Sequence, residues 1–324
     1  MKRSVWAVVV LAVIAIVLYF VLRSHPDEVV EMPPEYDSTY IKIGVLPTSE
    51  CLPFIVAEEY GISDSIGLKL HVELYDASMD ADTAFQKGYI DGVVSDMVKL
   101  SIMESRGDSV SAVLGGDLHL SLVTTRQSRV TEAKNLKDKI VSITRNSAID
   151  MYADKLLSSV KLESHEMNKP QINSLPIRYG MLCQNEYDGA ILPEPWAQMS
   201  LQKGCHLLSR SSDVTGMEKM FVLVLRDSVV RSRHDDISKL VKAYNQSIDY
   251  INQHRKTDIW KFLKLLQIEE NHNDSVLGDW QFEHAKTASE GSLSTARAWS
   301  RGRNLVKKQT KQNDVINKRF VNEE

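Results

Sequence analysis

The segment IDGVVS at Ile90–Ser95 has a counterpart, YDGAIL, at Tyr187–Leu192. In each, an Asp-Gly pair introduces a short apolar run, which is the pattern of a buried strand that starts at a turn. The two segments are about 97 residues apart, and the same offset relates Gly107 to Gly204, each at the end of a helix-like stretch. One offset that holds through a strand, a turn and a helix end indicates two similar α/β halves.

Strand-like and helix-like stretches alternate on either side of these Asp-Gly pairs. In the first half they are IKIGVL (41–46), PFIVAEEYG (53–61), LKLHVELY (68–75), a helix around 80–87, IDGVVS, and MVKLSIMES (97–105). The second half repeats this order with KIVSIT (139–144), AIDMYADKLL (148–157), YDGAIL and PWAQMSLQKG (195–204). Strands that alternate with helices are typical of a parallel sheet with helices on both faces.

The halves and the segments around them predict the domain organisation. We expect lobe 1 at residues 40–122, lobe 2 at 123–218, and a return strand with C-terminal helices that pack on lobe 1 at 219–324. Two further strand-like runs, His119–Thr125 and Met220–Ser228, flank the second lobe. We predict that they are two crossing strands, so that the lobes hinge around a cleft.

The N-terminal segment predicts a membrane anchor. Residues 5–22 are apolar throughout, which at 1.5 Å per residue crosses most of a hydrocarbon layer of about 30 Å. Lys2 and Arg3 make residues 1–4 a cytoplasmic n-region, so we expect a transmembrane signal-anchor at 5–22 and a linker at 23–39. The folded part then lies at the periplasmic face. A cleaved signal peptide and a secreted protein are the alternative, although no A-x-A-like site follows the apolar run.

Composition narrows the function classes. The chain has 324 residues, 43% of them hydrophobic and 25% charged, with a net charge of −4, so a disordered chain and a nucleic-acid partner are disfavoured. Cys51, Cys183 and Cys205 show no CxxC spacing, and whether Cys183 pairs with Cys205 stays open. The sequence has neither GxSxG nor HExxH, so we expect no metal, no cofactor and no enzyme activity.

The order and spacing of four segments resemble the solute-binding proteins of ABC importers. These segments are IKIGVLPTSECLPFIVAEEYGI (41–62), FQKGYIDGVVSD (85–96), NLKDKIVSITRNSAIDMYADKLL (135–157) and YDGAILPEPWA (187–197). Within that family the chain is most similar to the taurine, alkanesulfonate, nitrate and thiamine-pyrimidine binders, over roughly residues 40–322. The resemblance implies a monomer with a periplasmic-binding-protein-like fold, which closes on a small molecule and delivers it to permease and ATPase subunits.

The chain departs from this family in one respect. Its relatives are often soluble or carried on a lipidated cysteine, whereas this sequence starts with an apolar segment. The family also resembles fungal pyrimidine-synthesising enzymes, whose cysteine-rich cluster is represented here only by Cys51.

Candidate binding residues follow the strands, because ligands of open α/β sheets sit beyond the carboxyl ends of the strands. After the first strand come Ser49, Glu50 and Cys51, and the matching place in the second half holds Asn146, Ser147 and Ala148. Their hydroxyl, amide and backbone N–H groups at helix starts can hold a carboxylate, sulfonate or carbonyl oxygen. The alternative is that Ser49 and Ser147 only cap helices.

The third strand of each half ends in an acid, Asp96 in one and Glu194 in the other. Either acid can cap the helix that follows it, yet two carboxylates that face one cleft attract an amine or a protonatable, pyrimidine-like ring. Trp196 can stack on such a ring or simply pack in the core. The pair Gly115-Gly116 is read as a turn, with close approach to a ligand as the alternative.

We therefore predict a membrane-tethered solute-binding protein of an ABC importer that binds an amine, a pyrimidine-like or a sulfonate-like solute. An exported sensor that signals to a membrane partner would use the same cleft, and an enzyme on this fold is a further alternative.

Overall fold

The computed structural model describes residues 39–268, 282–307 and 314–321. The predicted n-region (1–4), the signal-anchor (5–22) and nearly all of the linker lie outside these residues. Among the residues that are described, no helix is both long enough and apolar enough to span a bilayer.

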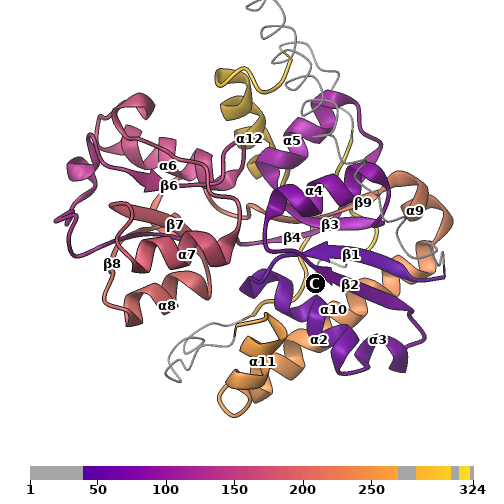
Figure 1. Ribbon diagram of the computed structural model, residues 1–324. Coiled ribbons are helices and arrows are strands. Elements are labelled where there is room, and N and C mark those ends of the chain that lie inside the picture. The colour runs from indigo at the N-terminus through magenta and orange to yellow at the C-terminus, as the bar shows by residue number, and fades with distance from the viewer. Residues whose placement is uncertain (1–38, 269–281, 308–313, 322–324) are drawn as a thin grey trace, which may run out of the picture. The chain divides into compact units, whose positions relative to one another are not determined.

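Lobe 1 is built on a five-stranded sheet with the order β2-β1-β3-β9-β4 (Figure 1). Its strands are β1 (Ile41–Val45), β2 (Leu70–Leu74), β3 (Gly92–Asp96), β4 (Val110–Gly116) and β9 (Phe221–Arg226). β1 is parallel to β2 and β3, as predicted, whereas β9 runs antiparallel to β3 and β4. The expectation of a purely parallel sheet is therefore wrong, because the chain returns from lobe 2 along β9.

Helices cover both faces of this sheet. One face carries α2 (Leu52–Glu59), α3 (Ile62–Ser65) and α10 (His234–His254), and the other carries α4 (Ser78–Lys87) and α5 (Met97–Arg106). The apolar stripe of α10, which repeats every three or four residues, is buried against α2 and α3. Two shorter helices, α9 (Asp227–Ser232) and α11 (Ile259–Leu265), flank α10 in the chain.

Lobe 2 has a four-stranded sheet with the order β6-β7-β5-β8. Its strands are β5 (Leu120–Thr124), β6 (Val141–Ser142), β7 (Gly189–Pro193) and β8 (His206–Arg210). Its helices are α6 (Ala148–Ser159), α7 (Leu175–Cys183) and α8 (Trp196–Gln202), with α6 on one face and the other two on the opposite face (Figure 1). Single 3-10 turns occur in both lobes at Ser49–Cys51, Ala133–Leu136, Ser164–Glu166 and Ser211–Asp213.

The Asp-Gly repeat has the same structural role in both lobes. The Asp91 carboxylate accepts the backbone N–H of Lys42 at 2.9 Å, and the Asp188 carboxylate accepts that of Ile140 at 2.9 Å. The glycine that follows each aspartate lies against a neighbouring antiparallel strand. At Gly189 a Cβ would stand 2.8 Å from the Val123 carbonyl oxygen, which is too close for any side chain. The repeated sequence is thus a repeated way of joining two strands.

This close approach leads to a stability prediction. We expect Gly189→Ala to lower the free energy of unfolding by about 2 kcal/mol, because backbone of β5 must shift to admit the methyl group. The matched control is Gly180→Ala on α7, where a Cβ meets nothing within 4 Å. We expect that variant to be unchanged or more stable by about 0.5–1 kcal/mol, since alanine favours a helix over glycine. Urea denaturation measures both; equal losses would contradict the steric account.

The two connections between the lobes differ from the predicted ones. β5 pairs with β7 and β8 inside lobe 2, and β9 pairs with β3 and β4 inside lobe 1. Neither strand crosses, because each finds its full set of hydrogen-bond partners within one sheet. The chain passes between the lobes in the short segments that precede these strands, at 117–119 and 211–220.

The C-terminal helix α12 (Glu290–Gly302) contacts both lobes. It packs on α5, where the Arg297 guanidinium binds the buried Glu104 carboxylate through two hydrogen bonds of 2.7 Å. It also packs on α6 of lobe 2, where Trp299 Nε1 donates to Asp154 at 3.0 Å. The prediction that the C-terminal helices pack on lobe 1 did not include the contact of α12 with lobe 2.

Candidate functional site between the lobes

A cavity of about 70 Å³, the inter-lobe cavity, lies at the carboxyl ends of strands from both lobes. Lobe 1 contributes Thr48, Glu50, Cys51, Ser78, Ser95, Asp96 and Lys99 to its lining, and lobe 2 contributes Thr144, Ser147, Ile149, Asn173, Leu175 and Pro193. This volume holds only a few water molecules, whereas pockets for drug-sized ligands measure about 300–1,000 Å³. A solute of several heavy atoms therefore needs more room than this cavity offers.

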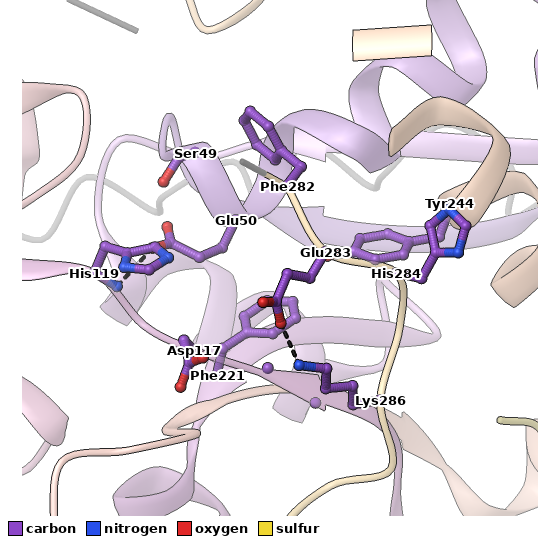
Figure 2. Close-up of a pocket in the computed structure, with 12 residues that line it drawn as sticks. Ser49, Glu50, Asp117, His119, Phe221, Tyr244, Phe282, Glu283, His284 and Lys286 are labelled. Carbon is purple, nitrogen blue, oxygen red and sulfur yellow. Dashed lines mark hydrogen bonds and ion pairs between the residues drawn. The ribbon is translucent and has the colours of Figure 1, made fainter. Parts of the chain in front are cut away.

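A second cavity of about 120 Å³, the hinge-side cavity, is shown in Figure 2. It lies beside the first connection between the lobes and is lined by Ser49, Glu50, Gly115–Asp117, His119, Phe221, Tyr244, Phe282–His284 and Lys286. Glu50 and Phe221 line both cavities.

The predicted site residues divide among these places. Four of the nine, Glu50, Cys51, Asp96 and Ser147, line the inter-lobe cavity. Ser49 lines the hinge-side cavity. The remaining four, Asn146, Ala148, Glu194 and Trp196, line neither cavity.

Ser49 and Glu50 present buried oxygen atoms that have no partner. The alternative that Ser49 caps a helix is wrong, because its Oγ makes no hydrogen bond among the described residues. Glu50 Oε1 accepts the backbone N–H of His119 at 2.9 Å, while Oε2 is buried and bonds none of the described residues. A buried polar atom without a hydrogen-bond partner is energetically costly.

Asp96 connects the starts of two helices. As its position predicted, it caps α5, accepting the N–H groups of Val98 at 2.9 Å and Lys99 at 3.1 Å. The backbone N–H of Ala148, the first residue of α6 in lobe 2, acts on the Asp96 carboxylate in the direction that lowers its pKa. Burial raises the pKa of Asp96, although Lys99 and these backbone bonds counteract it. A carboxylate of lobe 1 therefore lies at the positive end of a lobe 2 helix.

The loop before α6 is held by its own polar contacts. Ser147 caps the helix, as the alternative to ligand contact predicted: its Oγ accepts the N–H of Ile149 at 3.2 Å and donates to the Thr144 carbonyl at 2.7 Å. Asn146 has a positive φ of 56°, and its side chain is exposed. Its backbone N–H donates to Asp150 at 3.2 Å.

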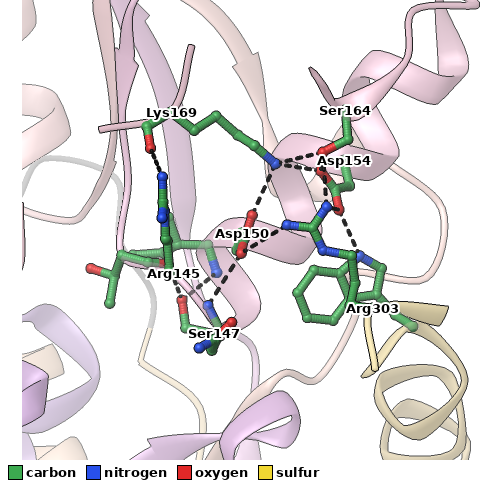
Figure 3. Close-up of polar contacts among 11 residues, drawn as sticks. Arg145, Ser147, Asp150, Asp154, Ser164, Lys169 and Arg303 are labelled. Carbon is green, nitrogen blue, oxygen red and sulfur yellow. Dashed lines mark hydrogen bonds and ion pairs between the residues drawn. The ribbon is translucent and has the colours of Figure 1, made fainter. Parts of the chain in front are cut away.

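Asp150 belongs to a charge cluster that also contains Asp154, Lys169 and the exposed Arg303 (Figure 3). Lys169 Nζ lies 3.0 Å from Asp150 and 2.6 Å from Asp154, and the Lys169 side chain is 9% exposed. Burial by itself would raise the pKa of Asp154, but hydrogen bonds from Lys169 and Ser164 outweigh it, so this pKa is lowered. The cluster fixes the loop that introduces α6.

Arg178, which sequence reasoning did not single out, holds two further parts of the cavity wall. It is fully buried and donates to the carbonyls of Ile172 at 2.9 Å and Ile191 at 3.0 Å, and to the Thr144 hydroxyl. Burial lowers its pKa to about 10, so it remains charged at neutral pH. Thr144 and the segment next to Asn173 are thereby positioned.

Glu194 and Trp196 join the lobes rather than line the cavity. Trp196 Nε1 donates to the Pro47 carbonyl at 2.7 Å, and its ring packs 5.4 Å from the ring of Tyr179. The backbone carbonyl of Glu194 accepts the N–H of Ser49 at 2.9 Å. Burial raises the pKa of Glu194 to about 7, and the charge of Glu50 adds to the rise.

The bond from Trp196 predicts a measurable loss. We expect Trp196→Phe to lower the free energy of unfolding by about 2 kcal/mol, because it keeps an aromatic ring but leaves the buried Pro47 carbonyl without its donor. Trp260→Phe, at a position that is 41% exposed, should stay within about 0.5 kcal/mol of the parent. Thermal and chemical denaturation test this, and a Trp196→Phe variant as stable as the control would contradict it.

Cysteine and metal chemistry have little support at this site. All three cysteines are thiols, so no disulfide joins Cys183 to Cys205. Cys51 is buried, which raises its pKa to about 12, and a neutral thiol is a weak nucleophile. Within the described part of the chain, no group of three or more His, Cys, Asp or Glu side chains could hold a metal ion.

Comparison with known proteins gives the fold a clear counterpart. No protein-family model and no curated protein sequence matches the chain. Among solved structures, the alkanesulfonate-binding protein SsuA from Xanthomonas axonopodis pv. citri, bound to MOPS, is similar with a TM-score of 0.69 and 13% identity over 83% of this chain and 95% of that one. The aliphatic sulphonate-binding protein SsuA from Escherichia coli gives 0.68 and 12% identity, with 85% and 95% covered.

A third similar structure is the zinc-bound ligand-binding component of an ABC-type import system from Staphylococcus aureus. Its TM-score is 0.66 at 17% identity, with 82% of this chain and 92% of that chain covered. The chain thus has the mixed α/β fold of the substrate-binding proteins of ABC importers, and the predicted resemblance is confirmed at the level of fold.

Proposed function

We propose that this chain is an extracytoplasmic solute-binding protein that captures a small organic molecule between its lobes and delivers it to the permease and ATPase subunits of an ABC importer. The observation that carries the proposal is the inter-lobe cavity, which both lobes line with residues at the carboxyl ends of strands. The shared fold with ABC-import binding proteins adds support. In this proposal residues 5–22 hold a monomer at the periplasmic face of the membrane.

The solute we propose carries hydrogen-bond donors on an amine or a pyrimidine-like ring. Glu50 and Asp96 bring two carboxylates to the cavity, and the one ammonium in its lining, Lys99, is paired with Asp82 at 2.5 Å. A sulfonate is less favoured, because the carboxylates of Glu50 and Asp96 repel an anion.

A binding role fits the cavity better than catalysis. In the part of the chain that the structure describes, the carboxylates of Glu50 and Asp96 bond only backbone N–H groups, and the neutral Cys51 thiol accepts the backbone N–H of Leu46 at 3.3 Å. We therefore propose a protein that releases its solute unchanged.

Ser95 provides the test. Its Oγ lines the cavity, is buried, and has no partner among the described residues. Native mass spectrometry of the purified chain against a panel of amines, pyrimidines and sulfonates should identify a bound solute. We then expect Ser95→Ala to weaken binding about tenfold with stability unchanged, since it removes a hydroxyl that bonds none of the residues that the structure describes.

The matched control is Ser247→Ala on α10, a buried serine whose hydroxyl bonds the Ala243 carbonyl far along the chain from the cavity lining. It should bind as the parent does. If no member of the panel binds, or if both variants bind equally well, the inter-lobe cavity is not the solute site.

A further inference from the structure

The hinge-side cavity combines aromatic rings with acidic side chains, and the proposed function makes no use of most of them. Its rings come from Phe221, Tyr244 and Phe282, and its carboxylates from Glu50, Asp117 and Glu283 (Figure 2). We propose that this cavity is a second ligand site, which takes a small organic cation such as a protonated amine or a quaternary ammonium group. This site goes beyond the proposed function, and it shares Glu50 and Phe221 with the inter-lobe cavity.

Two buried oxygen atoms at this cavity make no hydrogen bond to the described residues. Glu50 is 7% exposed and Ser49 is 3% exposed, and neither Glu50 Oε2 nor Ser49 Oγ makes a hydrogen bond within the described residues. The other carboxylate oxygen of Glu50 is tied to the backbone N–H of His119 at 2.9 Å, so the carboxylate is fixed in place (Figure 2). A cation offers both atoms what they lack, positive charge and, for an amine, N–H donors.

The charges around the cavity favour a cation over an anion. Among the described residues, the lining has three carboxylates and one ammonium, and that ammonium, on Lys286, is paired with Glu283. The imidazole of His284 lies 2.8 Å from Asp249, a carboxylate outside the lining. Lys286 and Glu283 have side chains that are 48% and 62% exposed, so they can swing toward solvent when another cation enters.

The rings supply the second half of the recognition. Phe221 begins β9, Tyr244 lies on α10, and Phe282 precedes the segment that pairs with Gly115 through Lys286. These three rings come from separate parts of the chain and line one small cavity, and a cation within about 6 Å of a ring face is attracted to it. Several aromatic residues together with a carboxylate can therefore recognise an ammonium group through cation–π attraction and opposite charge.

The test is calorimetric titration of the full-length chain, purified in nonionic detergent, with tetramethylammonium chloride. Sodium chloride at matched ionic strength and the neutral tert-butanol are the control ligands. We expect saturable binding of tetramethylammonium alone. Phe282→Ala should weaken it at least fivefold, and Lys286→Met should strengthen it at least twofold because a like charge is removed.

Asp96→Asn is the control for the other cavity, since Asp96 lines the inter-lobe cavity only and asparagine still caps a helix. It should leave tetramethylammonium binding within twofold of the parent. The proposal is overturned if tetramethylammonium does not bind, if Lys286→Met weakens binding, or if Asp96→Asn rather than Phe282→Ala abolishes it. The exposed position of Lys286 keeps that variant informative even if Phe282→Ala folds poorly.

Discussion

Lys169→Met is expected to lower the free energy of unfolding by about 3–5 kcal/mol at pH 7. The substitution preserves much of the side-chain volume but removes the ammonium that lies between two buried carboxylates, Asp150 at 1% and Asp154 at 13% exposure. Breaking a buried ion pair from one side leaves an uncompensated charge, which is the costly case. Arg303 lies 3.7–3.8 Å from these acids and offsets only part of the loss.

The same variant has a signature in its pH dependence. The folded-state pKa of Asp154 is below its ordinary value of 3.8, so the parent gains stability from this group above that value and loses it as the pH falls through the lowered pKa. We expect Lys169→Met to remove this gain, so that parent and variant differ less at pH 3 than at pH 7. Urea denaturation across this range is the measurement.

Lys137→Met is the matched control in the same lobe. Lys137 forms a surface ion pair with Glu166 at 2.9 Å, and its side chain is 58% exposed. Such pairs contribute little, so the control should lose less than about 1 kcal/mol. A loss at Lys169 no larger than this would contradict the role assigned to the charge cluster.

Glu194→Gln is expected to remove a pH dependence of stability worth roughly 3 kcal/mol. The folded-state pKa of Glu194 is raised from 4.5 to about 7 by burial and by the charge of Glu50 in the other lobe. Below about pH 4.5 the carboxyl group is protonated in both the folded and the unfolded protein, and its contribution to stability is then at its most favourable. Its contribution to stability then falls as the pH rises to about 7, and it is constant above that.

Denaturation curves at half-unit steps from pH 4.5 to 8 check this expectation. The parent should become less stable up to about pH 7, whereas Glu194→Gln should show a flatter profile and the higher stability at pH 8. Glu132→Gln, at an exposed position in lobe 2, is the control and should keep the slope of the parent. A slope that persists in Glu194→Gln would assign the titration to another group.

Much of the fold could be predicted because the sequence repeats its own pattern. The Asp-Gly pairs predicted β3 and β7, and their shared role is confirmed by the matching bonds to Lys42 and Ile140. β4 was missed because its last residues, Gly115 and Gly116, read as a turn. That prediction is wrong: both lie in β4, where a Cβ on Gly115 would stand 2.9 Å from Ala288 Cα, so glycine serves close approach of the C-terminal segment.

The sequence could predict only those site residues whose position depends on the local order of strands and helices along the chain. Glu50, Asp96 and Ser147 follow strands, and position along a strand is readable from alternation alone. Arg178 was beyond reach, because its hydrogen-bond partners lie on a loop and on β7, and only the tertiary fold brings them together. The hinge-side cavity was even harder to predict from the sequence, because its walls come from five stretches scattered between Ser49 and Lys286.

The position of α12 restricts how this molecule can move. The helix is bonded to lobe 1 through Arg297 and Glu104 and to lobe 2 through Trp299 and Asp154. If one lobe moves away from the other, the weaker of these two attachments must break or the lobe must rotate about α12. If the lobes rotate about α12, the largest displacement occurs at the edge of the lobes farthest from α12. A solute would then enter the cavity from that side.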